Sequence, residues 1–195
     1  MRIIGGTAAG RILKAPKGSA VRPTPDRVRE ALFNSLGTRV HEAHTLELFG
    51  GTGALSLEAL SRGAASALCV ELSGKHAGFI RENAKTIGFG APQFQARVAD
   101  VFDYLKRQGP ERPRFDLVFA DPPYGPKTRG ARSESMAQRT LEDPNLPTMM
   151  APNGLFLLGH AHRDDVTVPS AWRETRRYRY GDNVFLALEP AEGAS

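Results

Sequence analysis

Cysteine is nearly absent from this sequence, since Cys69 is the only one among 195 residues. A single cysteine excludes an intramolecular disulfide and a cysteine-based metal site. The five histidines lack carboxylate or cysteine partners at metal-ligand spacing, and we therefore expect no bound metal. The apolar residues around Cys69 indicate a buried strand, in which a lone thiol packs as a small apolar side chain.

Long apolar segments are also missing, because no run approaches the roughly 20 residues that a membrane-spanning helix requires. The opening residues Met1 to Gly6 do not have the charged and apolar order that begins a signal peptide. We therefore expect a cytoplasmic monomer without a membrane partner.

Acidic residues are scarce at the start of the chain. The net charge of +5 falls entirely within residues 1–30, which hold seven basic residues against two acidic ones. A neutral body with a basic leading segment is typical of a protein that contacts a polyanion with one end. A solvated basic segment that serves solubility is the alternative. The candidate contacts to nucleic acid are Arg2, Arg11, Lys14, Arg22, Arg27 and Arg29.

The leading segment predicts a hairpin followed by a helix. Residues 2–4 and 11–14 are short β-prone runs on either side of a glycine-rich stretch. Thr24 as N-cap and Pro25 in the first turn predict a helix that ends at Gly37. The expected organisation is a basic hairpin extension over residues 1–20, a main domain over 21–190 and a disordered tail over 191–195.

Strand and helix patterns alternate along the main domain. Strands are expected at residues 45–49, 67–71, 94–99, 115–120 and 155–158, with helices near 54–62, 74–87, 101–106 and 134–142. Residues 172–180 and 183–188 follow as an antiparallel hairpin across Gly181-Asp182. The pattern predicts an α/β fold with a Rossmann-like, mostly parallel sheet and an antiparallel C-terminal hairpin.

The ends of the first three strands predict a nucleoside cofactor. The first strand runs into Gly50-Gly51-Thr52-Gly53, and the next two end in Glu71 and Asp100. Such strand ends share one edge of a doubly wound sheet, and an acid about 20 residues after the glycines can accept bonds from ribose hydroxyls. A dinucleotide is disfavoured because the turn is not G-x-G-x-x-G. Taken singly, Glu71 or Asp100 could instead cap a helix.

The fourth strand, residues 115–120, is nearly all apolar and stops at Asp121-Pro122-Pro123-Tyr124. The prolines stiffen the turn after the strand. A carboxylate, peptide carbonyls and an aromatic ring then lie at the edge where open α/β sheets bind ligands. This set of groups suits an exocyclic amine on a nucleobase.

These motifs resemble a known family. Residues 47–53 resemble motif I of the class I S-adenosylmethionine-dependent methyltransferases, and residues 121–124 resemble the motif of their amino-group branch. Residues 2–6, 22–34, 53–55 and 58–64 are similar to the RsmD family, whose members methylate N2 of one guanine in 16S ribosomal RNA. The resemblance extends from Met1 to about Leu188.

The resemblance implies a class I methyltransferase fold, S-adenosylmethionine as cofactor, and 16S rRNA of the 30S subunit as partner. The implied cofactor residues are Glu47, Phe49, Gly50, Gly51, Gly53, Glu71, Asp100 and Val101. Asp121 and the Pro122 carbonyl would accept the N–H bonds of the amine, and Tyr124 would stack on the extruded base. The chain departs from the family at Glu47, where Asp is usual, and at Gly159-His160, where an acid and His are usual.

Two other functions stay open at this point. A DNA adenine-N6 methyltransferase shares the tetrapeptide, but no additional segment of domain size could serve for target recognition. A non-catalytic RNA-binding assembly factor is disfavoured by the intact set of acids. Residues 172–180 could also touch RNA, although charged outward positions on an edge strand are common for another reason.

Overall fold

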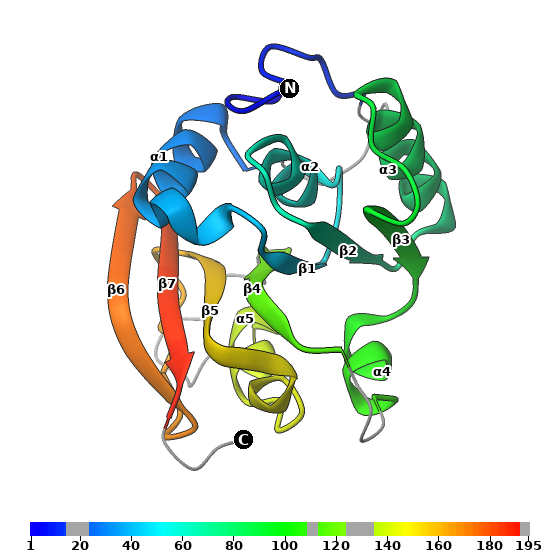
Figure 1. The fold of residues 1–195 in the computed structure, drawn as a ribbon. Helices are drawn as coiled ribbons and strands as arrows, with labels where there is room; N and C mark the ends of the chain where they lie inside the picture. Colours follow the sequence, from blue (N-terminus) through cyan, green and yellow to red (C-terminus); the bar gives the residue numbers. More distant parts are fainter. Residues whose placement is uncertain (15–23, 109–112, 124–134, 192–195) are drawn as a thin grey trace. The chain divides into compact units, whose positions relative to one another are not determined.

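The computed structural model describes residues 1–14, 24–108, 113–123 and 135–191 (Figure 1). Arg22 and Tyr124, two of the predicted site residues, lie outside the described residues, as does the tail beyond residue 191. The chain divides into two compact units, Met1–Val101 and Phe102–Ser195. Within the described ranges, no helix is long and apolar enough to cross a membrane.

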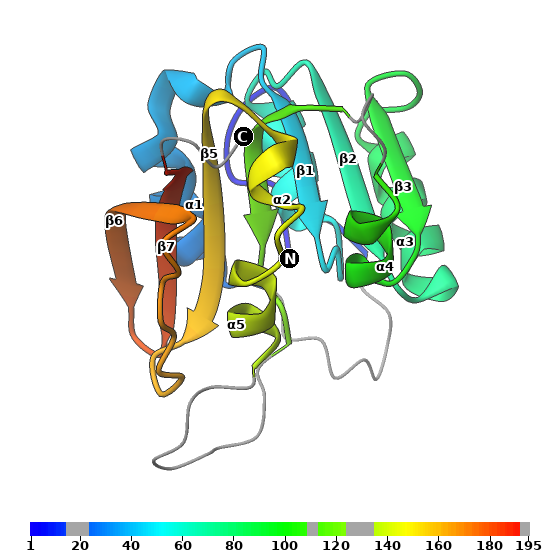
Figure 2. The same cartoon turned by 90° about the horizontal axis from the view of Figure 1, so that it is seen from below.

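The first unit contains three parallel strands in the order β3-β2-β1. The strands are β1 (His44–Leu48), β2 (Ser66–Glu71) and β3 (Phe94–Val98). The helices are α1 (Asp26–Leu36), η1 (Gly37–Val40), α2 (Ala54–Ser61) and α3 (Gly74–Thr86). Helix α2 packs against β1 and β2, and α3 packs against β2 and β3 (Figure 2). The predicted alternation of strand and helix is confirmed in this unit.

Helix α1 ends at Gly37 as predicted, but it begins differently. Pro25 is the N-cap residue, and no side chain caps the helix, so the prediction that Thr24 is the N-cap is wrong. The buried face includes Val28 and Leu32, as the spacing suggests, together with Phe33 and Leu36. Large apolar side chains thus define the inner face of the helix.

The predicted N-terminal hairpin is present only as a short antiparallel pairing. Arg2 and Ile12 form an isolated bridge, and Ile3 N donates to Arg11 O at 2.9 Å. The pairing does not continue, because the Glu58 side chain on α2 binds the backbone amides that follow Ile3. Ile4 N and Gly5 N each donate to the Glu58 carboxylate at 2.8 Å.

The second unit carries four strands in the order β4-β5-β7-β6. Helix α4 (Val101–Lys106) precedes β4 (Phe115–Ala120), which is followed by α5 (Met136–Leu141), η2 (Pro147–Met149), β5 (Met150–Ala161), β6 (Trp172–Tyr180) and β7 (Asn183–Pro190). Strands β4 and β5 are parallel, whereas β7 is antiparallel to both β5 and β6. The predicted C-terminal hairpin is confirmed, and β5 is longer than predicted.

An aromatic pair packs on the side of this sheet that carries α5. The rings of Phe156 and Trp172 lie 5.1 Å apart, and Trp172 Nε1 donates to Leu141 O at 3.0 Å. A buried tryptophan needs such a partner for its N–H group. The bond to the last residue of α5 therefore fixes α5 against β5 and β6, and β5 and α5 lie side by side in Figure 2.

Candidate active site

The glycine turn after β1 is shaped by packing within the first unit. A Cβ atom at Gly50 would lie 2.3 Å from Cys69 Sγ, and one at Gly53 would lie 2.6 Å from Ile80 Cγ2. Gly53 also has a φ of 72°, and Gly51 a φ of 56°. Glycine is needed at these positions because the turn packs closely against the side chains of β2 and α3.

Phe49 marks strain at the end of β1. Its φ is 59°, although it is not a glycine. A bulky residue in the left-handed region costs of order 1–3 kcal/mol and persists only where the surrounding structure enforces it. Such outliers cluster at functional sites, and the sequence alone gave no signal for this one.

Glu47 anchors the start of α2. Its side chain is buried, and its carboxylate accepts bonds from Ser56 N at 2.9 Å and Leu55 N at 3.3 Å. These amides are among the first N–H groups of a helix, which lack partners within it and favour a negative charge. Burial nevertheless raises the pKa of Glu47 from 4.5 to about 7. The carboxyl group thus titrates near neutral pH.

Glu71 joins the glycine turn to the start of α3. One carboxylate oxygen accepts from Gly51 N and the other from Ser73 N, each at 2.8 Å. Ser73 is the N-cap residue of α3. Glu71 therefore bonds the backbone at the start of α3, which agrees in part with the alternative that it caps a helix. His76 Nδ1 lies 3.5 Å from the oxygen that accepts from Ser73 N. The oxygen that accepts from Gly51 N keeps a second lone pair for a hydroxyl donor.

Asp100 follows β3 at the same edge as Glu71. Ala99 N donates to Glu71 O at 3.1 Å, which ties the ends of β2 and β3 together. Asp100 is exposed, while Val101 is buried at the start of α4. The structure therefore brings the glycine turn, Glu71 and Asp100 to neighbouring strand ends in the first unit.

Asp121 and Pro122 follow β4 in the second unit, where Asp121 is half-buried and Pro122 buried. Gly159 on β5 makes room for the carboxylate. A Cβ atom at Gly159 would lie 2.5 Å from Asp121 Oδ1 and 3.0 Å from Phe185 Cζ. The departure from the family at this position thus has a steric role, and Gly159 and Phe185 are site residues that sequence reasoning missed.

His160, the residue after Gly159, has a buried imidazole. Burial lowers its pKa below the usual value, and its Nδ1 bonds to Ala161 O at 3.0 Å. Among the residues that the structure describes, no group of three or more His, Cys, Asp or Glu side chains could hold a metal ion.

The basic N-terminal residues divide into two groups. Arg2, Arg11, Lys14 and Arg27 are exposed. Arg29 is fully buried, and its guanidinium donates to Thr24 O at 3.0 Å, to Arg2 O and to Asp26 at 3.1 Å. The prediction that Arg29 contacts RNA is therefore corrected. A buried charge requires hydrogen-bond partners, and the partners of Arg29 join the start of α1 to the N-terminal segment.

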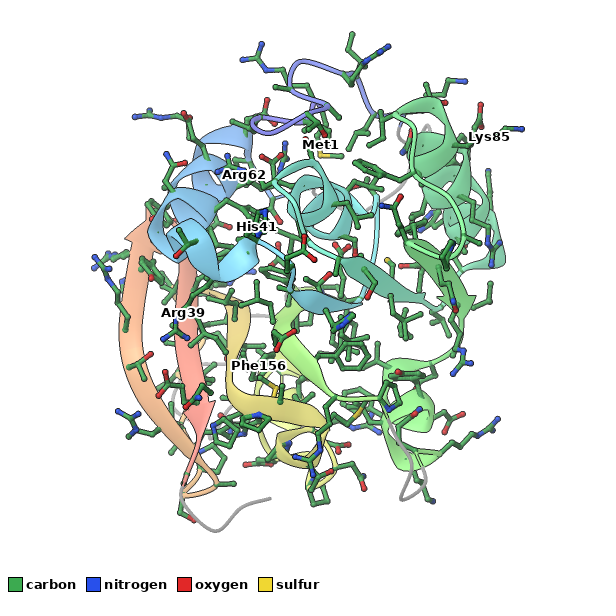
Figure 3. All side chains as sticks on the ribbon, in the orientation of Figure 1. Met1, Arg39, His41, Arg62, Lys85 and Phe156 are labelled. Atoms are coloured by element: carbon green, nitrogen blue, oxygen red, sulfur yellow. The ribbon has the colours of Figure 1, made fainter. Side chains whose placement is uncertain are left out.

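Glu58 and Ser61 hold the N-terminal segment on α2, and sequence reasoning missed both. Glu58 is fully buried and also accepts from Arg62 Nε at 2.8 Å. Ser61 Oγ donates to Gly5 O and accepts from Ala8 N at 2.9 Å. The Arg62 side chain, labelled in Figure 3, lies over the Phe33 ring at 5.3 Å. A polar side chain within an otherwise apolar helix was the available signal.

Comparison with solved structures defines the class of fold. The structure of the Escherichia coli protein yhhF matches with a TM-score of 0.78 and 31% identity, covering 98% of each chain. A solved methyltransferase-type structure complexed with SAH matches with a TM-score of 0.64 at 16% identity, covering 83% of this chain and 48% of its own. The chain has the class I methyltransferase fold.

Sequence comparison then gives the family. The chain belongs to the family described as Conserved hypothetical protein 95, whose model matches residues 1–189. It is 39% identical to the Escherichia coli protein named Ribosomal RNA small subunit methyltransferase D, over 100% of this chain and 93% of that protein. The match to the Haemophilus influenzae protein of the same name is 39% identical and spans 64% of each chain. The predicted resemblance to the RsmD family is confirmed.

Proposed function

We propose that this protein transfers a methyl group from S-adenosylmethionine to the exocyclic N2 of one guanine in 16S rRNA, within the assembled or assembling 30S subunit. One observation carries the proposal. Asp121 and Pro122 follow β4 in a chain that shares 39% identity over its full length with a protein named as a small-subunit rRNA methyltransferase. We further propose that it acts in the cytoplasm as a monomer without a metal ion.

The first unit supplies the residues that fit the cofactor. S-adenosylmethionine carries a nucleoside, a methionine and the reactive methyl group that it supplies when bound. Glu71 and Asp100 lie at adjacent strand ends and suit the ribose and the adenine edge, the latter together with the Val101 backbone. The turn from Glu47 to Gly53 would hold the methionine end, with Phe49, Gly50 and Gly51 as its backbone contacts. The positive φ values and bonded amides fix this turn in place.

The second unit supplies the residues for the amine. The lone pair of guanine N2 is delocalised into the ring, which makes the nitrogen a poor nucleophile. Asp121 and the Pro122 carbonyl would each accept a hydrogen bond from the amine, with about 2.7–3.1 Å between the nitrogen and the accepting oxygen. These two bonds would direct the lone pair of the nitrogen toward the methyl group. Asp121 can also take the proton that leaves the methylated nitrogen. Tyr124 would stack on the extruded base, which adds roughly 1–3 kcal/mol.

The N-terminal segment supplies the contact to the RNA backbone. Arg2, Arg11, Lys14 and Arg27 are exposed, whereas Glu58 and Ser61 fix the segment on α2. A segment that is held in place loses little conformational freedom on binding. We include Arg22 in this contact from its charge and its position in the sequence.

A comparison of substrates tests the proposal. The protein is incubated with methyl-labelled S-adenosylmethionine and with 30S subunits, naked 16S rRNA or double-stranded DNA. Labelling of 30S subunits or rRNA is expected. Labelling of DNA alone would favour the adenine methyltransferase, and RNA binding without cofactor binding would favour the assembly factor.

A further inference from the structure

Asp121 lies at one end of a row of residues that crosses the sheet of the second unit. Ala120 pairs with Leu158, so Asp121 follows next to Gly159, which pairs with Phe185 on β7. Phe185 in turn pairs with Tyr178 on β6. Residues that face each other across paired strands share one face of the sheet. Tyr178 therefore lies on the face that carries the Asp121 carboxylate over Gly159.

A register shift on β6 decides which of its side chains share this face. The shift falls between Glu174 and Arg176, and beyond it Arg176 pairs with Ala187 and Tyr180 with Asn183. Arg176, Tyr178 and Tyr180 thus lie on the Asp121 face. Arg177 and Arg179 pair with Leu186 and Val184 and lie on the opposite face, with Glu174.

The carboxyl end of β6 reaches the same edge as those of β4 and β5. Strand β6 is antiparallel to β7, and β7 is antiparallel to β5, so β6 runs parallel to β5. Their arrowheads point the same way in Figure 2. Three strand spacings of about 4.8 Å place Tyr178 roughly 14 Å from Asp121 along the row. A few nucleotides of a single strand can cover this distance.

The three side chains combine one cation with two aromatic rings. The Arg176 guanidinium lies 5.0 Å from the centre of the Tyr178 ring. Tyr180 is two residues beyond Tyr178 on the same face of the strand, and burial raises the pKa of its hydroxyl. Arg176 is exposed, and both tyrosines are half-exposed. We call Arg176, Tyr178 and Tyr180 the β6 cluster.

Ion pairing distinguishes Arg173 and Arg177 from Arg176. Arg173 pairs with Glu189, and Arg177 forms two bonds of 2.8 Å to Glu174. Within the described ranges, no carboxylate pairs with Arg176. A cation that stacks on a ring and keeps its N–H groups for a ligand suits a phosphate, while exposed aromatic faces suit bases.

We propose that the β6 cluster binds single-stranded RNA, receiving the nucleotides that flank the base held at Asp121. The inference rests on the proposed function and adds a second RNA contact to the basic N-terminal segment. Aromatic rings interleaved with arginine are the usual platform for unstacked nucleotides. Protection of an exposed edge strand requires charge, but it does not require both tyrosine rings to lie beside an arginine on the face that carries Asp121.

Matched variants on the two faces of β6 test the inference. Arg176→Gln and Arg179→Gln each remove one positive charge from an exposed position, and the two positions are three residues apart on opposite faces of β6. Binding of the full chain to 16S rRNA is measured at several salt concentrations. We expect Arg176→Gln to weaken binding about 5- to 10-fold and to reduce the salt slope by about 0.7, the loss of one phosphate contact. Arg179→Gln should change affinity less than about twofold.

The ring is tested separately. Tyr178→Ala should weaken rRNA binding roughly tenfold, because it removes the ring on which a base stacks, while Tyr178→Phe keeps the ring and should bind like the wild type. Affinity for S-adenosylmethionine should be unchanged in all four variants. If Tyr178→Ala does not fold, the two arginine variants decide.

Equal weakening by Arg176→Gln and Arg179→Gln would overturn the inference, because it would show a general effect of charge. Wild-type binding by Arg176→Gln would overturn it as well. Either result, combined with methylation of rRNA by the wild type, leaves the proposed function standing. A wild type that binds rRNA through the β6 cluster but transfers no methyl group would contradict the proposed function alone.

Discussion

At the scale of single residues, small changes in shape and charge control the candidate site. Only glycine fits at position 159, because the Asp121 carboxylate and the Phe185 ring fill the space that a Cβ atom would occupy. Phe49 adopts a left-handed φ that only its surroundings can maintain. The sequence predicted Asp121 and the glycine turn as site residues from their residue types and from their positions after strands. It could not identify Gly159, because its role depends on a contact between two strands.

Gly159→Ala should impair turnover without affecting the cofactor site. The new methyl group would lie 2.5 Å from Asp121 Oδ1 and must displace the carboxylate. A misplacement of about 1 Å costs on the order of 100-fold in rate. The measurement is kcat on rRNA together with the Kd for S-adenosylmethionine.

Gly78→Ala is the matched control, because a Cβ atom there meets nothing within 4 Å. It should keep kcat and add about 0.5–1 kcal/mol of stability, as alanine favours a helix over glycine. Equal kcat values for Gly159→Ala and the wild type would contradict the steric role of Gly159.

Glu47 should make stability depend on pH near neutrality. Its pKa in the folded chain is about 7 against an ordinary 4.5, so the folded state binds the proton more tightly than the unfolded state. The resulting stability is fully present below the ordinary pKa and is lost as pH rises through about 7, by up to about 3 kcal/mol.

Glu47→Gln removes this titration and provides the reference. The free energy of unfolding of wild type minus that of Glu47→Gln should fall between about pH 5 and pH 8. Parallel curves for the two proteins would show that Glu47 titrates in its ordinary range.

At the scale of elements, α2 connects the glycine turn with the N-terminal segment. Its first amides bond Glu47, and its second half holds residues 4–8 through Glu58 and Ser61. Alternation of apolar and glycine-rich segments was enough to predict nearly all helices and strands. The short hairpin pairing and the burial of Arg29 were not predictable, because Glu58 and Arg29 bond backbone groups far away in the sequence. The local residue types also suggested Thr24 rather than Pro25 as the N-cap of α1.

Glu58→Gln should loosen the N-terminal segment. The change removes the charge that Ile4 N, Gly5 N and Arg62 share, and it leaves Arg62 without its acidic partner. Breaking a buried ion pair costs about 3–5 kcal/mol. Chemical denaturation should show this loss, and limited proteolysis should cut within residues 1–14 faster than in the wild type.

Glu82→Gln serves as the control, since its pair with Lys14 is largely exposed. Exposed pairs contribute about 0–1 kcal/mol, so this variant should resemble the wild type. Similar losses in the two variants would refute the special role of Glu58.

At the scale of the whole molecule, the candidate cofactor residues belong to Met1–Val101 and the residues proposed to bind the amine belong to Phe102–Ser195. We therefore expect the first unit to determine the affinity for S-adenosylmethionine and the second unit to determine the rate of transfer. The sequence predicted that each group of residues follows a different strand, but it indicated one main domain over residues 21–190 and not two compact units. It also predicted the family, which the match over residues 1–189 confirms.

Substitutions in the two units should therefore separate binding from turnover. Asp121→Ala should keep the Kd for S-adenosylmethionine and lower kcat by roughly 100- to 1000-fold, the usual effect of removing one preorganised group. Glu71→Ala should lower the affinity for S-adenosylmethionine, since it removes the acceptor at the end of β2 and the bond that fixes Gly51. Calorimetry and single-turnover kinetics distinguish the two effects. A similar Kd change in both variants would contradict the division.

The position of the transferred methyl group tests the central claim most directly. Wild type and Asp121→Ala are incubated with labelled S-adenosylmethionine and 30S subunits, and the modified nucleotide is identified by mass spectrometry of 16S rRNA fragments. We predict N2-methylguanine at one site with the wild type and almost none with Asp121→Ala. A methyl group on another atom or base, or equal labelling by the two proteins, would contradict the proposed function.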